Sequence, residues 1–268
     1  MKTSPKGARR VFFNEFNVLM HKTAYLPLVS GLLRAYAETN ETIRDGYEFR
    51  EMFFYRDSPK RILSRYEDPA VAAFSVSMWN EQLNLEIARE VKRAYPACLI
   101  VFGGPHVPHD PARYFADHPF IDVAVRGEGE QTFSDILLRA LESRDFAKVP
   151  GLAWRDPGTG SCVRNPEERD QPRDLDHFPS PYLEGYFEGL MRDNPALAFQ
   201  AIIETNRGCP FPCTFCFWGQ GGLSRKYRFM GIDRVAAEFE WMAKNKIRYV
   251  FNADSNFGML ERDMDIAK

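Results

Sequence analysis

Asn206-Arg-Gly-Cys-Pro-Phe-Pro-Cys-Thr-Phe-Cys-Phe-Trp-Gly219 is the most informative stretch of this sequence, because it holds three of the five cysteines. Cys209, Cys213 and Cys216 follow a C-x3-C-x2-C spacing, which places three thiols within eight residues. Cysteine is the usual ligand of iron–sulfur clusters, and a closed cluster takes four. Three ligands leave one iron open to a small molecule. The spacing therefore predicts a catalytic cluster rather than a plain electron carrier.

Other uses of these cysteines fit the sequence less well. Structural zinc takes a fourth protein ligand, often from an H-x3-5-H pair. The histidines offer no such pair near the cysteines: His21, His106, His109, His118 and His177. A disulfide framework is disfavoured by the odd cysteine count and by the lack of a secretory leader. Reactive thiols without a metal are the third alternative.

Length and charge narrow the class of protein. The chain has 268 residues, which is enough for about two domains. Its net charge of −2 gives no reason to expect nucleic acid as a partner. No apolar run approaches the ~20 residues of a membrane-spanning helix, so we expect no membrane partner either. An oxygen-sensitive cluster and the odd cysteine count favour a reducing compartment. We expect a cytoplasmic protein.

Residues 11–145 are expected to form the first domain, because apolar runs alternate there with stripes at helical spacing. The expected strands are Val11–Val18, Glu48–Tyr55, Val71–Ser77, Cys98–Phe102 and Ile121–Val125. This alternation predicts an α/β fold, a doubly wound parallel sheet with helices on both faces. Ligands of such sheets bind beyond the carboxyl ends of the strands.

Small and polar residues gather at those strand ends. They are Ser75, Ser77, Gly103, Gly104, Pro105, His106, Gly127 and Glu128, and one large aromatic residue, Trp79, lies among them. Taken singly, a Gly-Gly pair after a strand is most simply a tight turn. In combination, small residues would let a bulky ligand approach the backbone.

The remainder of the chain divides into a connector and a second domain. Residues 146–197 contain a hairpin and a proline-rich connector, and residues 198–268 begin with a strand that leads into the cysteine loop. A helical stripe and a strand over Arg248–Ala253 follow, which is the start of a β/α barrel. A complete barrel takes ~250 residues. The sequence therefore predicts only the first part of a barrel, in a fragment or a truncated gene.

The cysteine stretch resembles that of the radical S-adenosylmethionine enzymes. The resemblance implies a 4Fe–4S cluster whose open iron binds the methionine moiety of S-adenosylmethionine, with Phe215 near the adenine. It also implies that Asp254 and Asn256, at the second strand end, contact the methionine ammonium; a solvated strand end is the alternative. An electron donor such as a flavodoxin or a ferredoxin is implied as a partner.

The strand ends of the first domain are similar to those of cobalamin-binding domains that precede radical S-adenosylmethionine domains. Ser-x-Ser, Gly-Gly-Pro-His and Arg-Gly-Glu-Gly-Glu carry the similarity, together with Tyr25, Leu26 and Pro27 after the first strand. The D-x-H-x-x-G motif of many cobalamin proteins is missing, and His21 lacks its Asp and Gly. We therefore expect no protein histidine beneath cobalt. Trp79 either faces the corrin or packs within the protein.

Both resemblances together imply a cobalamin-dependent radical S-adenosylmethionine enzyme, in which the first domain binds cobalamin and the second begins the radical domain. The implied activity is methylation of an unactivated carbon in a peptide or a small natural-product intermediate. Radical cyclisation or rearrangement with the same cofactors is the alternative among enzymes. A non-catalytic cobalamin-binding fragment is the alternative outside that class.

Overall fold

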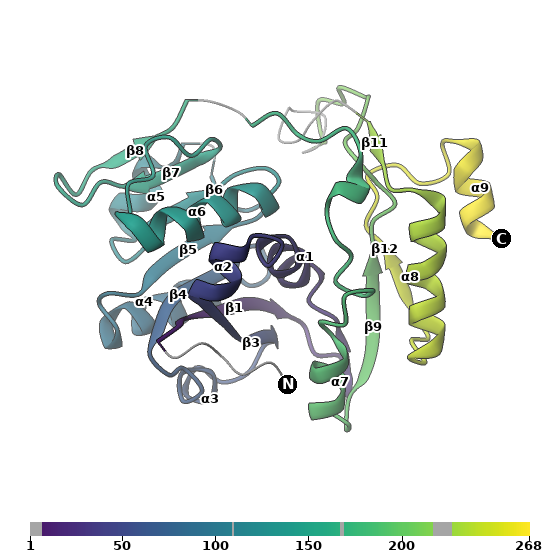
Figure 1. Ribbon diagram of the computed structural model, residues 1–268, viewed down its shortest axis with the longest axis horizontal. Coiled ribbons are helices and arrows are strands. Elements are labelled where there is room, and N and C mark those ends of the chain that lie inside the picture. Colours follow the sequence, from purple (N-terminus) through teal and green to yellow (C-terminus); the bar gives the residue numbers. More distant parts are fainter. Residues whose placement is uncertain (1–6, 109, 167–168, 217–226) are drawn as a thin grey trace. The chain divides into compact units, whose positions relative to one another are not determined.

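The computed structural model describes residues 7–108, 110–166, 169–216 and 227–268 (Figure 1). The chain divides into two compact units, Met1–Val18 with Tyr36–Arg169, and Leu19–Ala35 with Asp170–Lys268. The sequence analysis places residues 11–145 in one domain, whereas the structure groups residues 19–35 with the second unit. Within the described ranges, no helix combines the length and the apolarity that crossing a bilayer takes.

The first unit is built on one sheet with strand order β3-β1-β4-β5-β6-β7-β8. Its strands are β1 (Arg9–Asn17), β3 (Tyr47–Tyr55), β4 (Pro69–Ser75), β5 (Leu99–Gly103), β6 (Val123–Val125), β7 (Leu152–Arg155) and β8 (Cys162–Arg164). The pairs from β3 to β6 are parallel, and β7 and β8 add an antiparallel hairpin at one edge. The predicted parallel sheet is confirmed.

Two neighbouring phenylalanines on β1 show how both faces of this sheet are covered. Successive side chains of a strand point to opposite faces. Phe12 stacks on Tyr66 at 4.6 Å between ring centroids, whereas Phe13 packs on Phe133 at 5.5 Å. The helices of this unit are α2 (Glu41–Gly46), α3 (Pro59–Leu63), α4 (Glu81–Ala94), α5 (Pro111–Asp117) and α6 (Glu130–Glu142). The doubly wound arrangement is therefore present.

The strand order also fixes where a ligand is expected. Along the chain, the five parallel strands run in the order second, first, third, fourth, fifth across the sheet. The direction of winding reverses between β1 and β4, and ligands of doubly wound sheets bind at the carboxyl ends near this switch point. The strands end there at Asn17, Ser75, Gly103 and Val125.

The second unit holds a three-stranded parallel sheet, in the order β12-β9-β2. Its elements are β2 (Thr23–Tyr25), α1 (Leu28–Ala37), the 3-10 helix η1 (Leu175–His177), α7 (Glu188–Asp193), β9 (Ala198–Ile203), β10 (Asn206–Arg207), β11 (Arg228–Phe229), α8 (Ile232–Lys244), β12 (Val250–Asn252) and α9 (Glu261–Ala267). β9, α8 and β12 form the strand–helix–strand start of a barrel. On its other side β9 pairs with β2, where Thr23 lies beside Ala198 and Tyr25 beside Gln200.

Aromatic side chains pack the connector onto the second unit. Tyr182 and Phe187 are buried, and Tyr182 lies 5.1 Å from both the Phe187 ring and the Trp241 ring. Gly31 of α1 completes this contact, because a Cβ there would lie 2.6 Å from the Phe187 ring and 2.7 Å from Pro181. The segment before β9 is therefore a packed part of this unit.

Candidate functional site

The cysteine loop follows β9 and the short strand β10. Cys209, Cys213 and Cys216 are all free thiols; Cys213 is exposed and the other two are partly buried. The amide of Cys216 donates to the Cys213 carbonyl at 3.2 Å, which makes a turn of the second half of the loop. Gly219, quoted above as part of this stretch, lies outside the described residues.

The donor set of this loop fits an iron–sulfur cluster by its chemistry. Three unbridged thiols on one loop are the ligands that such a cluster takes. The described residues do not gather three or more His, Cys, Asp or Glu side chains into a metal-binding group. The three thiols therefore lie on one loop, but their sulfur atoms are not gathered around a single point. Phe215 is 89% exposed, so its ring is free to contact a ligand.

Asp254, just beyond β12, holds the residues that lead into the cysteine loop. Its carboxylate accepts hydrogen bonds from the amide and the hydroxyl of Thr205, at 2.6 and 2.5 Å, and from the amide of Asn206 at 3.1 Å. The family resemblance implies that this carboxylate contacts a ligand ammonium. In the structure both carboxylate oxygens of Asp254 accept hydrogen bonds from the protein itself: Oδ1 from two backbone amides and Oδ2 from the Thr205 hydroxyl.

The next two residues extend this clamp to the first cysteine. The Ser255 hydroxyl donates to the Gly208 carbonyl at 2.5 Å. The side-chain amide of Asn256 donates to the Cys209 sulfur, with 2.9 Å between Nδ2 and Sγ. Residues 254–256, which we call the clamp, therefore bind the loop at successive positions up to its first thiol.

Two further groups, not expected from the sequence, hold the clamp and the residues that follow it. The Tyr227 hydroxyl donates to the Asn256 carbonyl at 2.8 Å. Burial raises the pKa of Tyr227, and the neighbouring carboxylates of Asp263 and Asp254 raise it further, so this hydroxyl stays a donor. Asp263, 1% exposed, accepts three backbone amides at 3.0 Å through Oδ2: those of Gly258, Met259 and Leu260.

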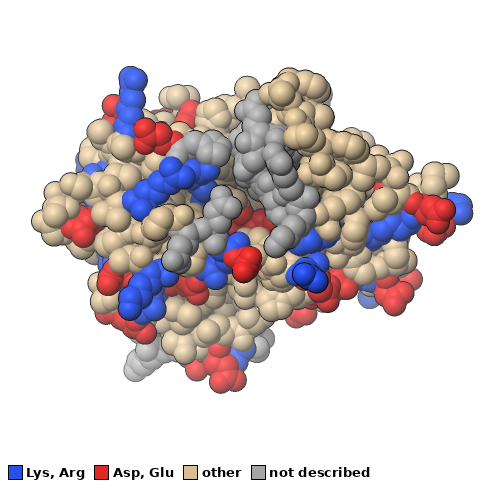
Figure 2. All heavy atoms as spheres, turned by 90° about the horizontal axis from the view of Figure 1, so that it is seen from above, with Lys and Arg blue, Asp and Glu red and all other residues tan. Residues whose placement is uncertain are grey.

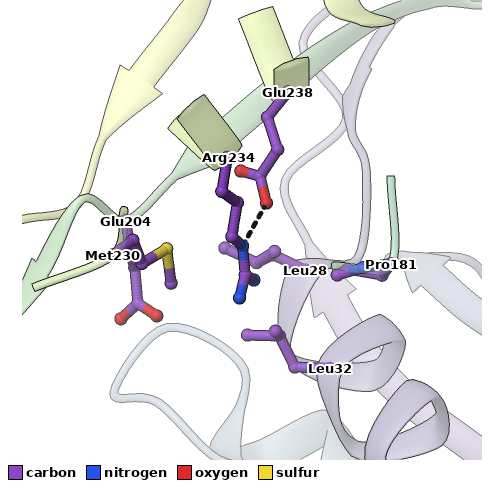
Figure 3. A pocket seen from close by; sticks show the side chains of 7 residues that line it. All are labelled: Leu28, Leu32, Pro181, Glu204, Met230, Arg234 and Glu238. Atoms are coloured by element: carbon purple, nitrogen blue, oxygen red, sulfur yellow. Dashed lines mark hydrogen bonds and ion pairs between the residues drawn. The ribbon is translucent and has the colours of Figure 1, made fainter. Parts of the chain in front are cut away.

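A small hollow in the second unit lies beside α1 and α8 (Figure 3). It is lined by Leu28, Leu32, Pro181, Glu204, Met230, Arg234 and Glu238. The Arg234 guanidinium pairs with Glu238 at 3.1 Å, and Glu204 pairs with Arg207 at 2.8 Å. Its walls are thus apolar side chains and charges that already have partners, which suits packing better than recognition of a polar ligand.

In the first unit, two asparagines shape the end of β4. Asn80 accepts the Ser77 amide at 2.8 Å and donates to the Ser75 carbonyl at 3.0 Å. Asn84 donates to the same carbonyl and to Asn80, both at 3.0 Å. The sequence analysis missed these roles, although asparagines four apart at a helix start lie on one face. They fix Ser75 and Ser77 and leave Trp79, 52% exposed, outside the core.

The two glycines after β5 have different reasons to be glycine. Gly104 has a φ of +119°, and a Cβ there would lie 2.6 Å from the Val76 carbonyl oxygen. The turn itself therefore requires Gly104. A Cβ on Gly103 would meet Val125 at an ordinary 3.7 Å, so the fold tolerates a larger residue there. Gly103 is thus the sharper probe of an approaching ligand.

The remaining predicted residues fall at two places. Pro105 and His106 are exposed beyond β5, and His106 pairs with Glu81 at 3.3 Å between Nε2 and Oε2. Gly127 is exposed beyond β6 with a φ of +77°, followed by the partly buried Glu128. Tyr25, Leu26 and Pro27, at the end of β2, belong to the second unit, where the Leu26 amide donates to Gln200 at 2.9 Å.

The distribution of charged side chains on the surface does not indicate a particular class of binding partner. Figure 2 shows Lys and Arg interspersed with Asp and Glu over one face of the molecule, in keeping with the net charge of −2. Such a mixed surface differs from the basic stripe by which nucleic-acid-binding domains are recognised.

Comparison with known proteins agrees with this geometry. The family model described as a B12 binding domain matches residues 42–137. The chain is 40% identical to a 2-(S-pantetheinyl)-carbapenam-3-carboxylate methyltransferase of Streptantibioticus cattleyicolor, over 98% of this chain and 38% of that protein. It is 39% identical to the cobalamin-dependent radical SAM methyltransferase TokK of Streptomyces tokunonensis, over 97% of this chain and 37% of that protein.

The chain is a homologue of the cobalamin-dependent radical S-adenosylmethionine enzymes. It spans somewhat over a third of the length of these curated relatives. The fold is similar to that of one solved enzyme of this kind. The solved structure of the radical S-adenosylmethionine methyltransferase TsrM from Kitasatospora setae, with cobalamin and a 4Fe–4S cluster bound, matches with a TM-score of 0.70 at 20% identity. That match covers 97% of this chain and 50% of TsrM.

Proposed function

We propose that this chain forms the cofactor-binding part of a cobalamin-dependent radical S-adenosylmethionine methyltransferase. The observation that carries the proposal is the loop of three free cysteines after β9 and β10, in a chain whose other unit matches a B12 binding domain. When bound, the 4Fe–4S cluster and S-adenosylmethionine supply a radical that takes hydrogen from an unactivated carbon, and cobalamin supplies the methyl group.

Cys209, Cys213 and Cys216 would hold the cluster, with Phe215 beside the adenine. Support comes from the three unbridged thiols and from the exposure of the Phe215 ring. The clamp keeps the start of the loop in place through Asp254 and its bonds to Thr205. The chain's contribution is therefore to present three thiols and an aromatic ring from a fixed strand end.

Cobalamin would bind at the carboxyl edge of the first unit's sheet. The supporting residues are those beyond β4, β5 and β6: Ser75, Ser77, Trp79, Gly103, Gly104, Pro105, His106, Gly127 and Glu128. The exposed Trp79 ring supplies an apolar surface for a corrin face. Tyr25, Leu26 and Pro27 belong to the second unit, and their contact with cobalamin stays a prediction from the sequence resemblance. No protein histidine is assigned beneath cobalt.

The substrate proposed is a small molecule, with a peptide or an antibiotic intermediate as the finer possibilities, and the methyl acceptor is an unactivated carbon. The name of one relative, a carbapenam carboxylate methyltransferase, supports the small-molecule class. A flavodoxin or a ferredoxin would supply the electron, in a reducing cytoplasm.

The products formed from S-adenosylmethionine test this proposal. The chain would be reconstituted anaerobically with iron, sulfide and hydroxocobalamin, reduced, and analysed by mass spectrometry. Methyl transfer to cobalamin predicts S-adenosylhomocysteine, and radical cleavage predicts 5′-deoxyadenosine. Deoxyadenosine without S-adenosylhomocysteine would favour cyclisation or rearrangement. Bound cobalamin with neither product would favour a non-catalytic module and contradict the proposal.

A further inference from the structure

Cys209 differs from an ordinary loop thiol because a side-chain amide is aimed at it. Nδ2 of Asn256 lies 2.9 Å from the Cys209 sulfur, although the two residues are 47 positions apart in the chain. An amide nitrogen can only donate, so the sulfur is the acceptor in this contact. A thiolate, which carries the negative charge, is the form of cysteine that accepts best.

Both partners of this contact are fixed independently of it. On the cysteine side, the Gly208 carbonyl accepts from Ser255 and the Thr205 amide donates to Asp254. On the asparagine side, the Tyr227 hydroxyl binds the Asn256 carbonyl at 2.8 Å. The donor is therefore positioned before any ligand arrives, and needs no rearrangement to reach the sulfur.

The segment after Asn256 is also ordered by its own contacts. Asp263 gathers the amides of Gly258, Met259 and Leu260, and Arg262 donates to the Met230 carbonyl at 2.7 Å. Arg262 further lies over the Phe229 ring, 4.8 Å from its centroid. The loop after β12 is thus anchored at both ends, with Asn256 at the end nearer the cysteines.

We propose that Asn256 donates a hydrogen bond to the Cys209 thiolate of the bound cluster, raising its reduction potential and slowing its loss. Hydrogen bonds to the ligand sulfurs are one of the protein's means of setting the potential of a cluster. The donor stabilises the reduced cluster more than the oxidised one, because reduction adds negative charge at the sulfur. Asn256 is a positioning residue for the metal centre, and its side-chain oxygen is the atom that a ligand ammonium would need as an acceptor.

The inference rests on the proposed cluster at Cys209, Cys213 and Cys216. The test compares the parent chain with Asn256→Leu, which removes the donor at similar bulk. Asn256→Asp is a second variant of the same size as asparagine, in case leucine disturbs the fold. Phe257→Leu, at the exposed neighbouring position, is the matched control. Each protein is reconstituted anaerobically without S-adenosylmethionine, and its folding is checked by circular dichroism.

Two measurements are made on these proteins. A redox titration followed by electron paramagnetic resonance gives the midpoint potential, and absorbance in the presence of a chelator gives the rate of cluster loss. In both Asn256 variants we expect a more negative midpoint and cluster loss faster by about tenfold, the lower end for residues that orient metal ligands. Phe257→Leu should match the parent in both.

The possible failures separate this inference from the function on which it rests. If Asn256→Leu and Asn256→Asp both keep the midpoint and the loss rate of the parent, the inference is overturned and the proposed cluster stands. If the parent chain takes up no iron–sulfur cluster at all, both are overturned together.

Discussion

Thr205 and Asp254 are joined by two hydrogen bonds, from the Thr205 amide at 2.6 Å and from its hydroxyl at 2.5 Å, one to each carboxylate oxygen. The pair ties the end of β9 to the end of β12, two neighbouring parallel strands. Only the short strand β10 separates Thr205 from the cysteine loop, so this contact sets the position from which the thiols are presented. The Asp254 carboxylate therefore supports the cysteine loop through its hydrogen bonds to Thr205 and Asn206.

Replacing that carboxylate should weaken the loop. In Asp254→Asn, an amide donor replaces one acceptor oxygen and faces the donors of Thr205 and Asn206. Leaving a buried donor unsatisfied costs about 1–3 kcal/mol. We expect the free energy of unfolding, measured with a chemical denaturant, to fall by that amount. The exposed Glu261→Gln serves as the control, and equal stabilities of Asp254→Asn and the parent would show that the carboxylate supports nothing.

The two glycines after β5 should respond differently to alanine. Gly104→Ala places a Cβ 2.6 Å from the Val76 oxygen at a positive φ, so we expect a loss of about 1–3 kcal/mol in cobalamin-free stability. Gly103→Ala should leave that stability nearly unchanged and weaken cobalamin binding by roughly tenfold or more, equivalent to ~1.4 kcal/mol. Thermal denaturation and fluorescence titration measure the two effects. Unchanged cobalamin affinity in Gly103→Ala would remove Gly103 from the cofactor site.

Buried thiol and phenol groups should make the protein sensitive to alkali. Burial raises the pKa of Cys98 and of Tyr47 to about 12 each, whereas exposed groups ionise near ~8.5 and ~10. Above these exposed values the unfolded chain binds fewer protons than the folded one. Stability therefore falls as pH rises from about 8.5 toward the folded pKa values. Denaturant unfolding against pH should show a shallower decline in Cys98→Ala; an identical slope in parent and variant would be inconsistent with a buried, neutral thiol.

The cobalt of bound cobalamin should lack a protein nitrogen beneath it. His106 is paired with Glu81, and His21 lacks the Asp and Gly of the D-x-H-x-x-G motif. Electron paramagnetic resonance of bound cob(II)alamin detects an axial imidazole by its nitrogen superhyperfine splitting. We expect no such splitting in the parent. Splitting that disappears in His21→Ala or His106→Ala would identify the ligand and refute the prediction.

Local pattern predicted most of the fold, and long-range pairing accounts for what it missed. The strand expected at Val71–Ser77 is present as β4, which begins and ends two residues earlier. It could be predicted because its apolar run and its turn residues are adjacent in the sequence. The pairing of β2 with β9 joins three residues at Thr23–Tyr25 to a strand over 170 positions away. Periodicity within a segment carries no information on such a partner.

The same distinction applies to the site. The three cysteines could be found because their spacing is local. The contact of Asn256 with Cys209 depends on how two strand ends lie side by side, which the sequence alone does not specify. Short helix α5 was also missed, although Asp110 followed by Pro111 is a recognisable helix start: the Asp110 side chain accepts the Ala112 amide.

Iron content after anaerobic reconstitution tests the central claim most directly. The parent is compared with the triple variant Cys209→Ala, Cys213→Ala, Cys216→Ala, and with the double variant Cys98→Ala, Cys162→Ala, which removes the other two thiols. We predict a full 4Fe–4S spectrum with matching iron and sulfide in the parent and in the double variant, and none in the triple variant. A triple variant that keeps the complete 4Fe–4S spectrum would contradict the account.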